Sequence, residues 1–365
     1  MRIVAGLSLK NLHPRVWDPA SQYFLPSLRG VMVSYGEFHQ MPARMEKAKD
    51  CGLRTYLGVP KNISVYLDNG AFYFLRAGGQ ADRQAYQEFV EKAKPDWYPI
   101  AFDVIPTPQM SNARQQRCFD YTMNANRAFT HDGYVPVIHI CRVLDQYVRA
   151  IMRNPKLAAK DRIALGAMVP NLLRAPKALS YNTVLENLLR IRAVFRNKAI
   201  HVFGIGGTAT AHLAALLDID SVDSSGWRNR AARGIVQLPG SGDRMVANLG
   251  KWRGRSPSVE EWKKLHCCAC PACATRGVRG LKASGLDGFC NRATHNLWVL
   301  LEEARWLKKH LLADSYAKNF RRRLDNSTYL PLIEKVLEMK QLEEKAADDG
   351  CKASNGKSKL TRSGD

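Results

Sequence analysis

The chain has 365 residues, of which 45% are hydrophobic and 24% charged, and this composition excludes a wholly disordered protein. Its 55 lysines and arginines outnumber 33 acidic residues, and the net charge of +22 favours a polyanion, most simply nucleic acid, as partner. No apolar run reaches the roughly 18 residues of a membrane span, and the first residues lack the apolar region and cleavage site of a secretory signal. We therefore expect neither a membrane protein nor a secreted one.

Short apolar and β-branched runs alternate with helix-length segments along the first part of the chain. Strands are expected at residues 3–6, 30–34, 64–67, 98–103, 134–140, 162–168, 199–204 and 219–222. Helices are expected at residues 82–94, 112–129, 180–196 and 208–217. Eight strand–helix units over roughly 225 residues predict an α/β fold, a (β/α)8 TIM-type barrel. A doubly wound open sheet is the alternative, and its nucleotide-binding form is weakened because no G-x-G-x-x-G follows the first strand.

The composition changes after the last predicted strand. Residues 240–255 are rich in Gly, Ser, Arg and Lys and are expected to form an exposed basic loop, whereas 294–312 and 331–344 have helical spacing. From residue 345 the chain has no apolar periodicity. We divide it into most of the barrel (1–239), a basic loop with a zinc-binding segment and its helix (240–312), a helical extension (313–344) and a disordered tail (345–365).

Five of the nine cysteines fall in one short segment, at positions 267, 268, 270, 273 and 290. An odd count and a tight cluster argue for a reducing compartment and a metal site rather than a disulfide framework. Cys268-x-Cys270-x-x-Cys273, followed by His295, supplies three thiolates and one imidazole, which is a closed tetrahedral set for a structural Zn²⁺. The remaining candidates for ligands are His266, Cys267 and Cys290.

Three carboxylates end predicted strands: Asp68, Asp103 and Asp223. The C-terminal ends of barrel strands line the active-site mouth, and three acids meeting there are costly to bury without a function or a partner. Phe72 and Phe203 lie beside glycine-bearing turns, where aromatic faces can sandwich a planar base. Taken singly, each acid also fits an ordinary strand-end Asp, and each Phe fits core packing.

In chain order, these segments resemble the tRNA-guanine transglycosylases. LDNGAF at 67–72 resembles the family's Asp-Ser-Gly-Gly-Phe-Gln segment, and AFD at 101–103 resembles the segment of its base-reading Asp. HVFGIG at 201–206 resembles the strand that closes over the base, and SVD at 221–223 resembles the segment that carries the nucleophile. The cysteine segment and HNL at 295–297 resemble the zinc site and its helix, so the resemblance covers residues 60–310 or so.

Several positions depart from the family pattern. Ala71 and Tyr73 replace its second Gly and its Gln, and His139 stands where the family has a Gln after the fifth strand. Its Gly-Gly-Leu-Ala-x-Gly-Glu stretch is reduced to residues 165–170, and its Pro-Thr-Arg is replaced by residues 224–228. This pattern most resembles the divergent DNA branch, the DpdA proteins, which exchange guanine in DNA for a 7-deazaguanine such as preQ0.

The resemblance implies a role for each matching residue. Asp223 would attack C1′ to form a covalent glycosyl intermediate, Asp68 would act as general acid and base, and Asp103 would accept hydrogen bonds from the purine. Phe72 and Phe203 would stack on the base. Further base-binding positions are His139, Gly166, Met168 and Gly204.

Phosphate contacts are expected from arginines after the nucleophile segment, namely Arg228, Arg230, Arg233, Arg253 and Arg255, with residues 321–323 as further candidates. The expected cofactor is structural Zn²⁺. The expected partners are DNA, a free 7-deazaguanine and accessory DNA-modification proteins, in the cytoplasm of a bacterial or phage-infected cell. The alternatives are a transglycosylase acting on tRNA and a non-catalytic, zinc-stabilised nucleic-acid-binding paralogue.

Overall fold

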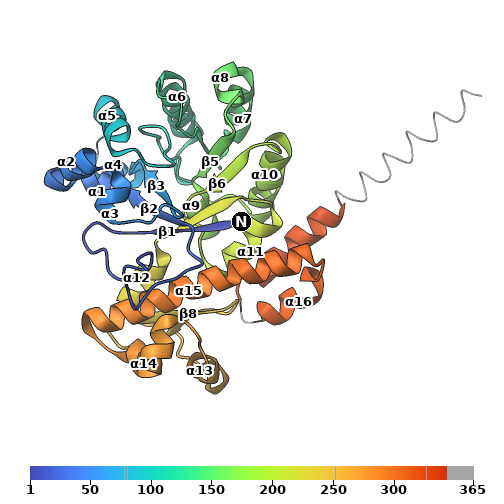
Figure 1. The fold of residues 1–365 in the computed structure, drawn as a ribbon. Coiled ribbons are helices and arrows are strands. Elements are labelled where there is room, and N and C mark those ends of the chain that lie inside the picture. Colours follow the sequence, from blue (N-terminus) through green and yellow to red (C-terminus); the bar gives the residue numbers. More distant parts are fainter. Residues whose placement is uncertain (78, 80, 251, 326, 343–365) are drawn as a thin grey trace, which may run out of the picture.

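A curled, seven-stranded parallel sheet forms the centre of the molecule (Figure 1). The computed structural model describes residues 1–77, 79, 81–250, 252–325 and 327–342. The strand order is β3-β2-β1-β7-β6-β5-β4. The strands are β1 (Arg2–Gly6), β2 (Gly30–Ser34), β3 (Ser64–Asp68), β4 (Val137–His139), β5 (Arg162–Gly166), β6 (Ala199–Val202) and β7 (Ser221–Ser224).

The predicted strand at 98–103 does not form as a regular strand. Isolated parallel bridges from Tyr66 to Trp97 and from Pro99 to Val135 hold this stretch between β3 and the chain just before β4. Proline has no N–H to donate to a ladder, so Pro99 interrupts the pairing that the apolar residues around it favour. The sheet therefore has seven regular strands, and one irregular segment lies between its edges.

Helices follow most strands and lie around the outside of the curled sheet (Figure 1). The four predicted helices are confirmed to within two residues at each end, as α5 (Arg83–Ala93), α6 (Asn112–Ala128), α10 (Tyr181–Val194) and α11 (Thr208–Leu216). The others in this part are α1 (Tyr35–His39), α2 (Pro42–Cys51), α3 (Leu53–Leu57), α4 (Ala71–Ala77), α7 (Leu144–Arg153), α8 (Pro155–Ala158), α9 (Met168–Leu172) and α12 (Gly226–Ala232).

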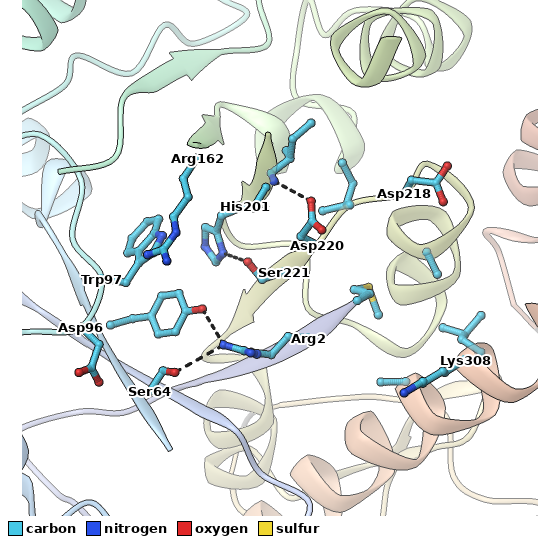
Figure 2. Close-up of a pocket in the computed structure, with 18 of the residues that line it drawn as sticks. Arg2, Ser64, Asp96, Trp97, Arg162, His201, Asp218, Asp220, Ser221 and Lys308 are labelled. Atoms are coloured by element: carbon cyan, nitrogen blue, oxygen red, sulfur yellow. Dashed lines mark hydrogen bonds between the residues drawn. The ribbon is translucent and has the colours of Figure 1, made fainter. Parts of the chain in front are cut away.

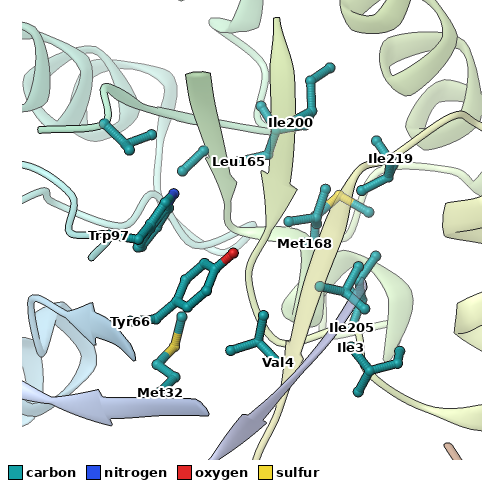
Figure 3. Packing of buried hydrophobic residues seen from close by; sticks show 14 of the residues in the cluster. Ile3, Val4, Met32, Tyr66, Trp97, Leu165, Met168, Ile200, Ile205 and Ile219 are labelled. Atoms are coloured by element: carbon teal, nitrogen blue, oxygen red, sulfur yellow. The ribbon is translucent and has the colours of Figure 1, made fainter. Parts of the chain in front are cut away.

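Apolar side chains from neighbouring strands fill the space inside and around the sheet. Figure 3 shows Val4, Leu165 and Ile200 from three strands, with the rings of Tyr66 and Trp97 beside them. The strands are buried along nearly their whole length, as expected for parallel strands covered on both faces. This packing fixes the register, which sets the residues at the C-terminal ends of the strands along one edge.

The C-terminal third adds a hairpin and a helical layer. It contains β8 (Ile235–Leu238), antiparallel to β9 (Gly242–Met245), followed by α13 (Val259–His266), α14 (Pro271–Lys282), α15 (Gly285–Leu312) and α16 (Tyr316–Arg323). Residues 330–342 are also helical, in agreement with the described part of the predicted 331–344 helix. The predicted tail at 345–365 lies outside the described residues.

The prediction of an exposed basic loop at residues 240–255 is wrong for the first part of that segment, where β9 forms. Arg244 is buried there, and its Nε donates to Glu261 of α13 at 2.8 Å. The charge of Arg244, one of the residues that made the segment look exposed, is thus neutralised inside the hairpin–helix contact.

The long helix α15 crosses the molecule and packs on α11, α12, α14, β1 and β8 (Figure 1). Its buried face carries a row of polar side chains: Arg292, His295, Asn296 and Glu303. Each of them has hydrogen-bond partners, as buried polar groups require. Among the described helices, none combines the length and the apolar character that crossing a membrane requires.

Candidate active site and metal centre

A cavity of about 310 Å³ opens at the C-terminal edge of the sheet and contains all three predicted carboxylates. Asp68 ends β3, Asp223 lies in β7, and Asp103 follows the irregular segment between β3 and β4. The cavity is also lined by most of the predicted base-binding residues, namely Phe72, Gly166, Met168, Phe203 and Gly204. The structure therefore brings these residues together in the place where parallel α/β folds bind ligands.

Asp68 is held by two donors on one carboxylate oxygen. Ser34 Oγ donates to Oδ2 at 2.8 Å, and the Gly70 N–H donates to the same oxygen at 3.1 Å. Gly70 has φ +79°, and a Cβ there would lie 2.5 Å from the backbone nitrogen of Gly36, so only glycine fits this turn. Burial raises the pKa of Asp68 from 3.8 to about 6, and repulsion from Asp223 and Asp103 adds to the effect. Asp68 can therefore accept or release a proton close to neutral pH.

Asp103 is buried, and both of its oxygens have neighbours. Asn69 Nδ2 donates to Oδ1 at 2.7 Å, and His139 Nε2 lies 3.0 Å from Oδ2. Gly166 provides the room for the imidazole ring, because a Cβ there would lie 2.6 Å from His139 Nδ1. Among the predicted base-binding residues, His139 is thus the one that lies behind Asp103 rather than in the cavity wall.

Asn69 lines the cavity and was not singled out from the sequence. Its Oδ1 accepts from the Ala71 N–H at 3.0 Å, which forms the local turn, and this leaves its amide to bind Asp103. The sequence feature that could have identified Asn69 is its position directly after Asp68 in an Asp-Asn-Gly turn.

Asp223 is fixed by the loop that follows β6. Its Oδ1 accepts from the Gly204 N–H at 2.7 Å, and its backbone carbonyl accepts from the Gly206 N–H at 3.0 Å. A Cβ at Gly206 would lie 2.6 Å from that carbonyl oxygen, so the loop can press on β7 only because residue 206 is glycine. Asp220, the next carboxylate back along the chain, lies at the opposite end of β7, where it accepts from the Ile200 N–H at 2.8 Å.

Two aromatic rings border the cavity from different elements. Phe72 of α4 is 50% exposed, whereas Phe203 is half-buried against Trp97 and His201. Met168 adds an apolar surface. An exposed ring and a packed ring around three carboxylates suit a planar, N–H-rich heterocycle.

The metal-ligand prediction corresponds to a compact cluster. The ligand atoms of Cys268, Cys270, Cys273 and His295 all lie within 4.8 Å of one another, and the three sulfurs are 3.4, 3.7 and 3.5 Å from His295 Nδ1. Such spacings suit tetrahedral zinc with metal–ligand bonds of about 2.0–2.3 Å. His295 Nε2 lies 2.9 Å from the carbonyl oxygen of Gln237, a contact that leaves Nδ1 to bind metal.

None of the alternative ligands takes part in this cluster. His266 and Cys267 are exposed, and Cys290 is buried in α15 outside the group. The residues therefore fit a closed structural site of three cysteines and one histidine.

The predicted phosphate-binding arginines do not form one group. Arg228 is buried, and its Nη1 donates to the carbonyl oxygen of His13 at 2.6 Å, so its guanidinium holds the N-terminal loop. Arg230 Nε lies 2.7 and 2.8 Å from the two oxygens of Asp243. Arg253 is exposed and donates to nearby carbonyl oxygens.

A second hollow, of about 760 Å³, adjoins the carboxylate cavity and shares Val169, Gly204 and Ser225 with it. Its lining includes Arg230, Arg233 and Arg255. In the part of the chain that is described, neither Arg233 nor Arg255 has a salt-bridge partner. Arg233 lies over the ring of Trp252 at 4.1 Å.

The described residues thus form an α/β fold with a three-carboxylate cavity at the C-terminal edge of its curled parallel sheet, where such folds place ligand and active sites, and a cysteine–histidine cluster that could hold a metal ion. The chain is 23% identical to the tRNA-guanine(15) transglycosylase of Pyrococcus abyssi over 316 residues, which is 80% of the chain and 49% of the relative. It is 24% identical to the protein of the same name from Methanocaldococcus jannaschii over 277 residues, 72% of the chain and 39% of the relative.

The chain thus spans half or less of the length of these curated relatives, and no family model matches it. The similarity is distant, and it supports the predicted superfamily and enzyme class. The DNA-modifying branch stays a prediction.

We expect the purified protein to contain about one Zn²⁺ per chain and the Cys270→Ser variant to lose it, because serine is a poor zinc ligand. Metal analysis measures the content, and thermal unfolding reports the accompanying loss of stability. Cys267→Ser is the matched control: this neighbouring cysteine is exposed and outside the cluster, so its variant should keep the metal. Full metal content in Cys270→Ser would contradict the assignment.

We expect Asp68→Asn to stabilise the free protein above pH 6. Because the folded-state pKa is raised to about 6 from 3.8, the folded protein binds the proton more tightly, and the free energy of unfolding falls as pH rises through this interval. Asparagine carries no charge, so the variant should gain on the order of 1–3 kcal/mol at pH 8.

Urea unfolding of both proteins at pH 8 and near pH 4 measures this difference. The gain should disappear near pH 4, where the folded wild type is protonated. Asp50→Asn, a change at an exposed carboxylate, should alter stability by less than about 0.5 kcal/mol at either pH. An equal gain for Asp68→Asn at both pH values would show that the carboxylate charge is not its cause.

Proposed function

We propose that the protein is a transglycosylase that exchanges guanine in DNA for a 7-deazaguanine base such as preQ0. The proposal rests on one observation: Asp68, Asp103 and Asp223 line the same cavity. The three carboxylates differ in their surroundings, and burial tunes Asp68 for proton transfer near neutral pH. The distant tRNA-guanine transglycosylases support the same reaction class.

In the proposed reaction, a carboxylate oxygen of Asp223 bonds to C1′ while the C1′–N9 bond breaks and its electron pair leaves with the guanine. Asp68 gives a proton to the departing base. It then accepts one from the incoming base, whose nitrogen bonds to C1′ as the Asp223 ester bond breaks. Two displacements at the same carbon retain the anomeric configuration and replace one difficult step by two easier ones.

Base recognition is proposed for Asp103. A carboxylate accepts hydrogen bonds from purine N–H groups more strongly than an amide does. Asn69 in the cavity wall and His139 behind it hold Asp103, which fixes the direction of its remaining lone pairs. Phe72 and Phe203 provide the faces on which a flipped base can stack, offsetting a few kcal/mol of unstacking.

We also propose that the irregular segment at 97–99 takes the place of the eighth strand of a barrel. Its bridges to Tyr66 and Val135 support this arrangement.

Cys268, Cys270, Cys273 and His295 would hold Zn²⁺ with no open position, so the ion would tie α14 to α15 and β8. We also propose that residues 1–239 form most of the barrel and that residues 240–312 form the metal-binding segment.

Nucleic acid is proposed to bind along the second hollow, where Arg233 and Arg255 can contact phosphates beside the base-binding cavity. DNA is preferred to tRNA because residues 224–228 depart from the Pro-Thr-Arg of the tRNA enzymes. The relatives' names favour tRNA, which is therefore the second candidate substrate.

The exchange is tested with labelled preQ0 and either guanine-containing duplex DNA or a tRNA transcript, followed by digestion to nucleosides. We expect label in a modified deoxynucleoside, and a covalent protein–DNA adduct on a denaturing gel. Asp223→Ala should abolish both, because the attacking oxygen is lost. Asp220→Asn is the matched control, since Asp220 lies at the other end of β7 and its variant should keep exchange.

Label in tRNA alone would make the second candidate the function. Absence of label from both nucleic acids would refute base exchange, and an adduct with Asp223→Ala would place the nucleophile elsewhere.

DNA affinity should fall steeply with salt, because phosphate contacts release counterions. Arg233→Ala should weaken binding and lower the slope of log Kd against log salt by about 1, the value for one lost contact. Arg305→Ala on α15 removes an exposed arginine outside the hollow and should leave the slope unchanged. Fluorescence anisotropy from 50 to 300 mM salt measures the slope, and equal slopes for the two variants would exclude Arg233 from the interface.

A further inference from the structure

A histidine lies beneath Asp223 and belongs to none of the roles described so far. His201 of β6 is 2% exposed, and its Nδ1 lies 2.9 Å from Ser221 Oγ at the N-terminal end of β7 (Figure 2). Its Nε2 lies 3.5 Å from Asp223 Oδ1. The rings of Trp97 and Phe203 pack on the imidazole with centroids 5.0 and 4.9 Å away, so the ring is fixed in this orientation.

The contacts of His201 favour one of the two neutral forms of the imidazole. A carboxylate only accepts hydrogen bonds, so its position beside Nε2 favours the form that carries N–H there. In the neutral ring, Nδ1 then accepts from the Ser221 hydroxyl. Within the described residues, Nε2 has no completed hydrogen bond, and Oδ1 of the Asp223 carboxylate lies 3.5 Å away. Such contacts often tighten when substrate binds.

The two oxygens of Asp223 are therefore unequal. Oδ1 accepts from the Gly204 N–H and faces His201 Nε2. No hydrogen bond reaches Oδ2 from any described residue. An oxygen without donors keeps its lone pairs available for bond formation, so the geometry favours Oδ2 as the attacking atom.

We propose that His201 is a positioning residue for Asp223: it holds Oδ1 so that Oδ2 attacks C1′, and it stabilises the carboxylate when that bond breaks. The inference rests on the proposed function. In the first displacement the Oδ2–C1′ bond forms and the electron pair of the C1′–N9 bond leaves with the base. In the second, the incoming nitrogen bonds to C1′, and the Oδ2–C1′ electron pair returns to the carboxylate.

The two steps depend differently on His201. Negative charge leaves the carboxylate in the first displacement and returns to it in the second, where it spreads onto Oδ1. A donor on Oδ1 therefore helps most when the glycosyl ester breaks. A histidine that only filled space inside the sheet would have no such preference.

Three variants separate these roles. His201→Leu removes the donor, His201→Gln keeps an amide N–H that can reach the place of Nε2, and Ser221→Ala removes the hydroxyl that orients the ring. The adduct is formed with the full chain and labelled guanine-containing DNA, with a tRNA transcript in parallel, and is then chased with unlabelled preQ0. Its decay on denaturing gels gives the lifetime, and circular dichroism melting shows whether each variant is folded.

We expect the adduct of His201→Leu to live about 10- to 100-fold longer than the wild-type adduct, as for loss of a hydrogen bond to a charged group. His201→Gln should stay within about threefold of wild type, and Ser221→Ala should fall between the two. If His201→Leu does not fold, the adduct lifetimes of Ser221→Ala and His201→Gln are compared instead, and a longer lifetime for Ser221→Ala supports the role of His201.

Equal lifetimes in all folded variants would overturn the role of His201 and leave the proposed exchange intact. So would a lifetime for His201→Gln as long as that for His201→Leu. Absence of any wild-type adduct with either nucleic acid would instead refute the proposed function itself.

Discussion

A single buried amide holds together three elements on which the candidate site depends. Asn296 of α15 donates through Nδ2 to the carbonyl oxygens of Trp227 and Ile235, both at 3.1 Å, and its Oδ1 accepts from the Gln237 N–H at 2.7 Å. Its hydrogen-bonding groups are thus used on α12 and β8, and a buried amide left unpaired would cost about 1–3 kcal/mol per group. His295, the adjacent residue, joins the cysteine cluster. The helix that supplies the histidine of the cluster is therefore attached directly to α12, which follows the strand of Asp223.

The need of buried polar groups for hydrogen-bond partners also explains how three carboxylates share one cavity. Asp103 has Asn69 and His139 as partners, and Asp223 has the Gly204 N–H. Asp68 is satisfied on one oxygen only, and the proximity of the other two acids makes its charged form costly. A destabilised charge is the property that the proton transfer proposed for Asp68 needs, and it lowers the stability of the fold at the same position.

The sequence predicted the parts of the fold that depend on periodicity and on strand ends. Asp68 and Asp223 were placed correctly because parallel strands end along one edge, and the cysteine spacing identified a cluster that the structure forms. The strand at 98–103 was not predicted correctly, because apolar content outweighed Pro99 in the pattern. Arg228 was expected at the surface because it is charged. The sequence does not show that backbone carbonyl oxygens accept hydrogen bonds from its guanidinium. His201 was missed as a partner of Asp223 because the side chains of neighbouring strands meet only once the register is known.

The two adjoining hollows carry opposite charge. Among the described residues, the lining of the carboxylate cavity has three acids and no lysine or arginine, while Arg233 and Arg255 border the neighbouring hollow. They share Val169, Gly204 and Ser225, so the change of sign occurs at a common wall, where screening over a Debye length of about 8–10 Å is incomplete. For the nucleic acid proposed as substrate, this change of sign would attract phosphates to the arginine side and repel them from the acidic side, which only an uncharged ring could enter at low cost. The local field would thus separate backbone from base before either makes contact.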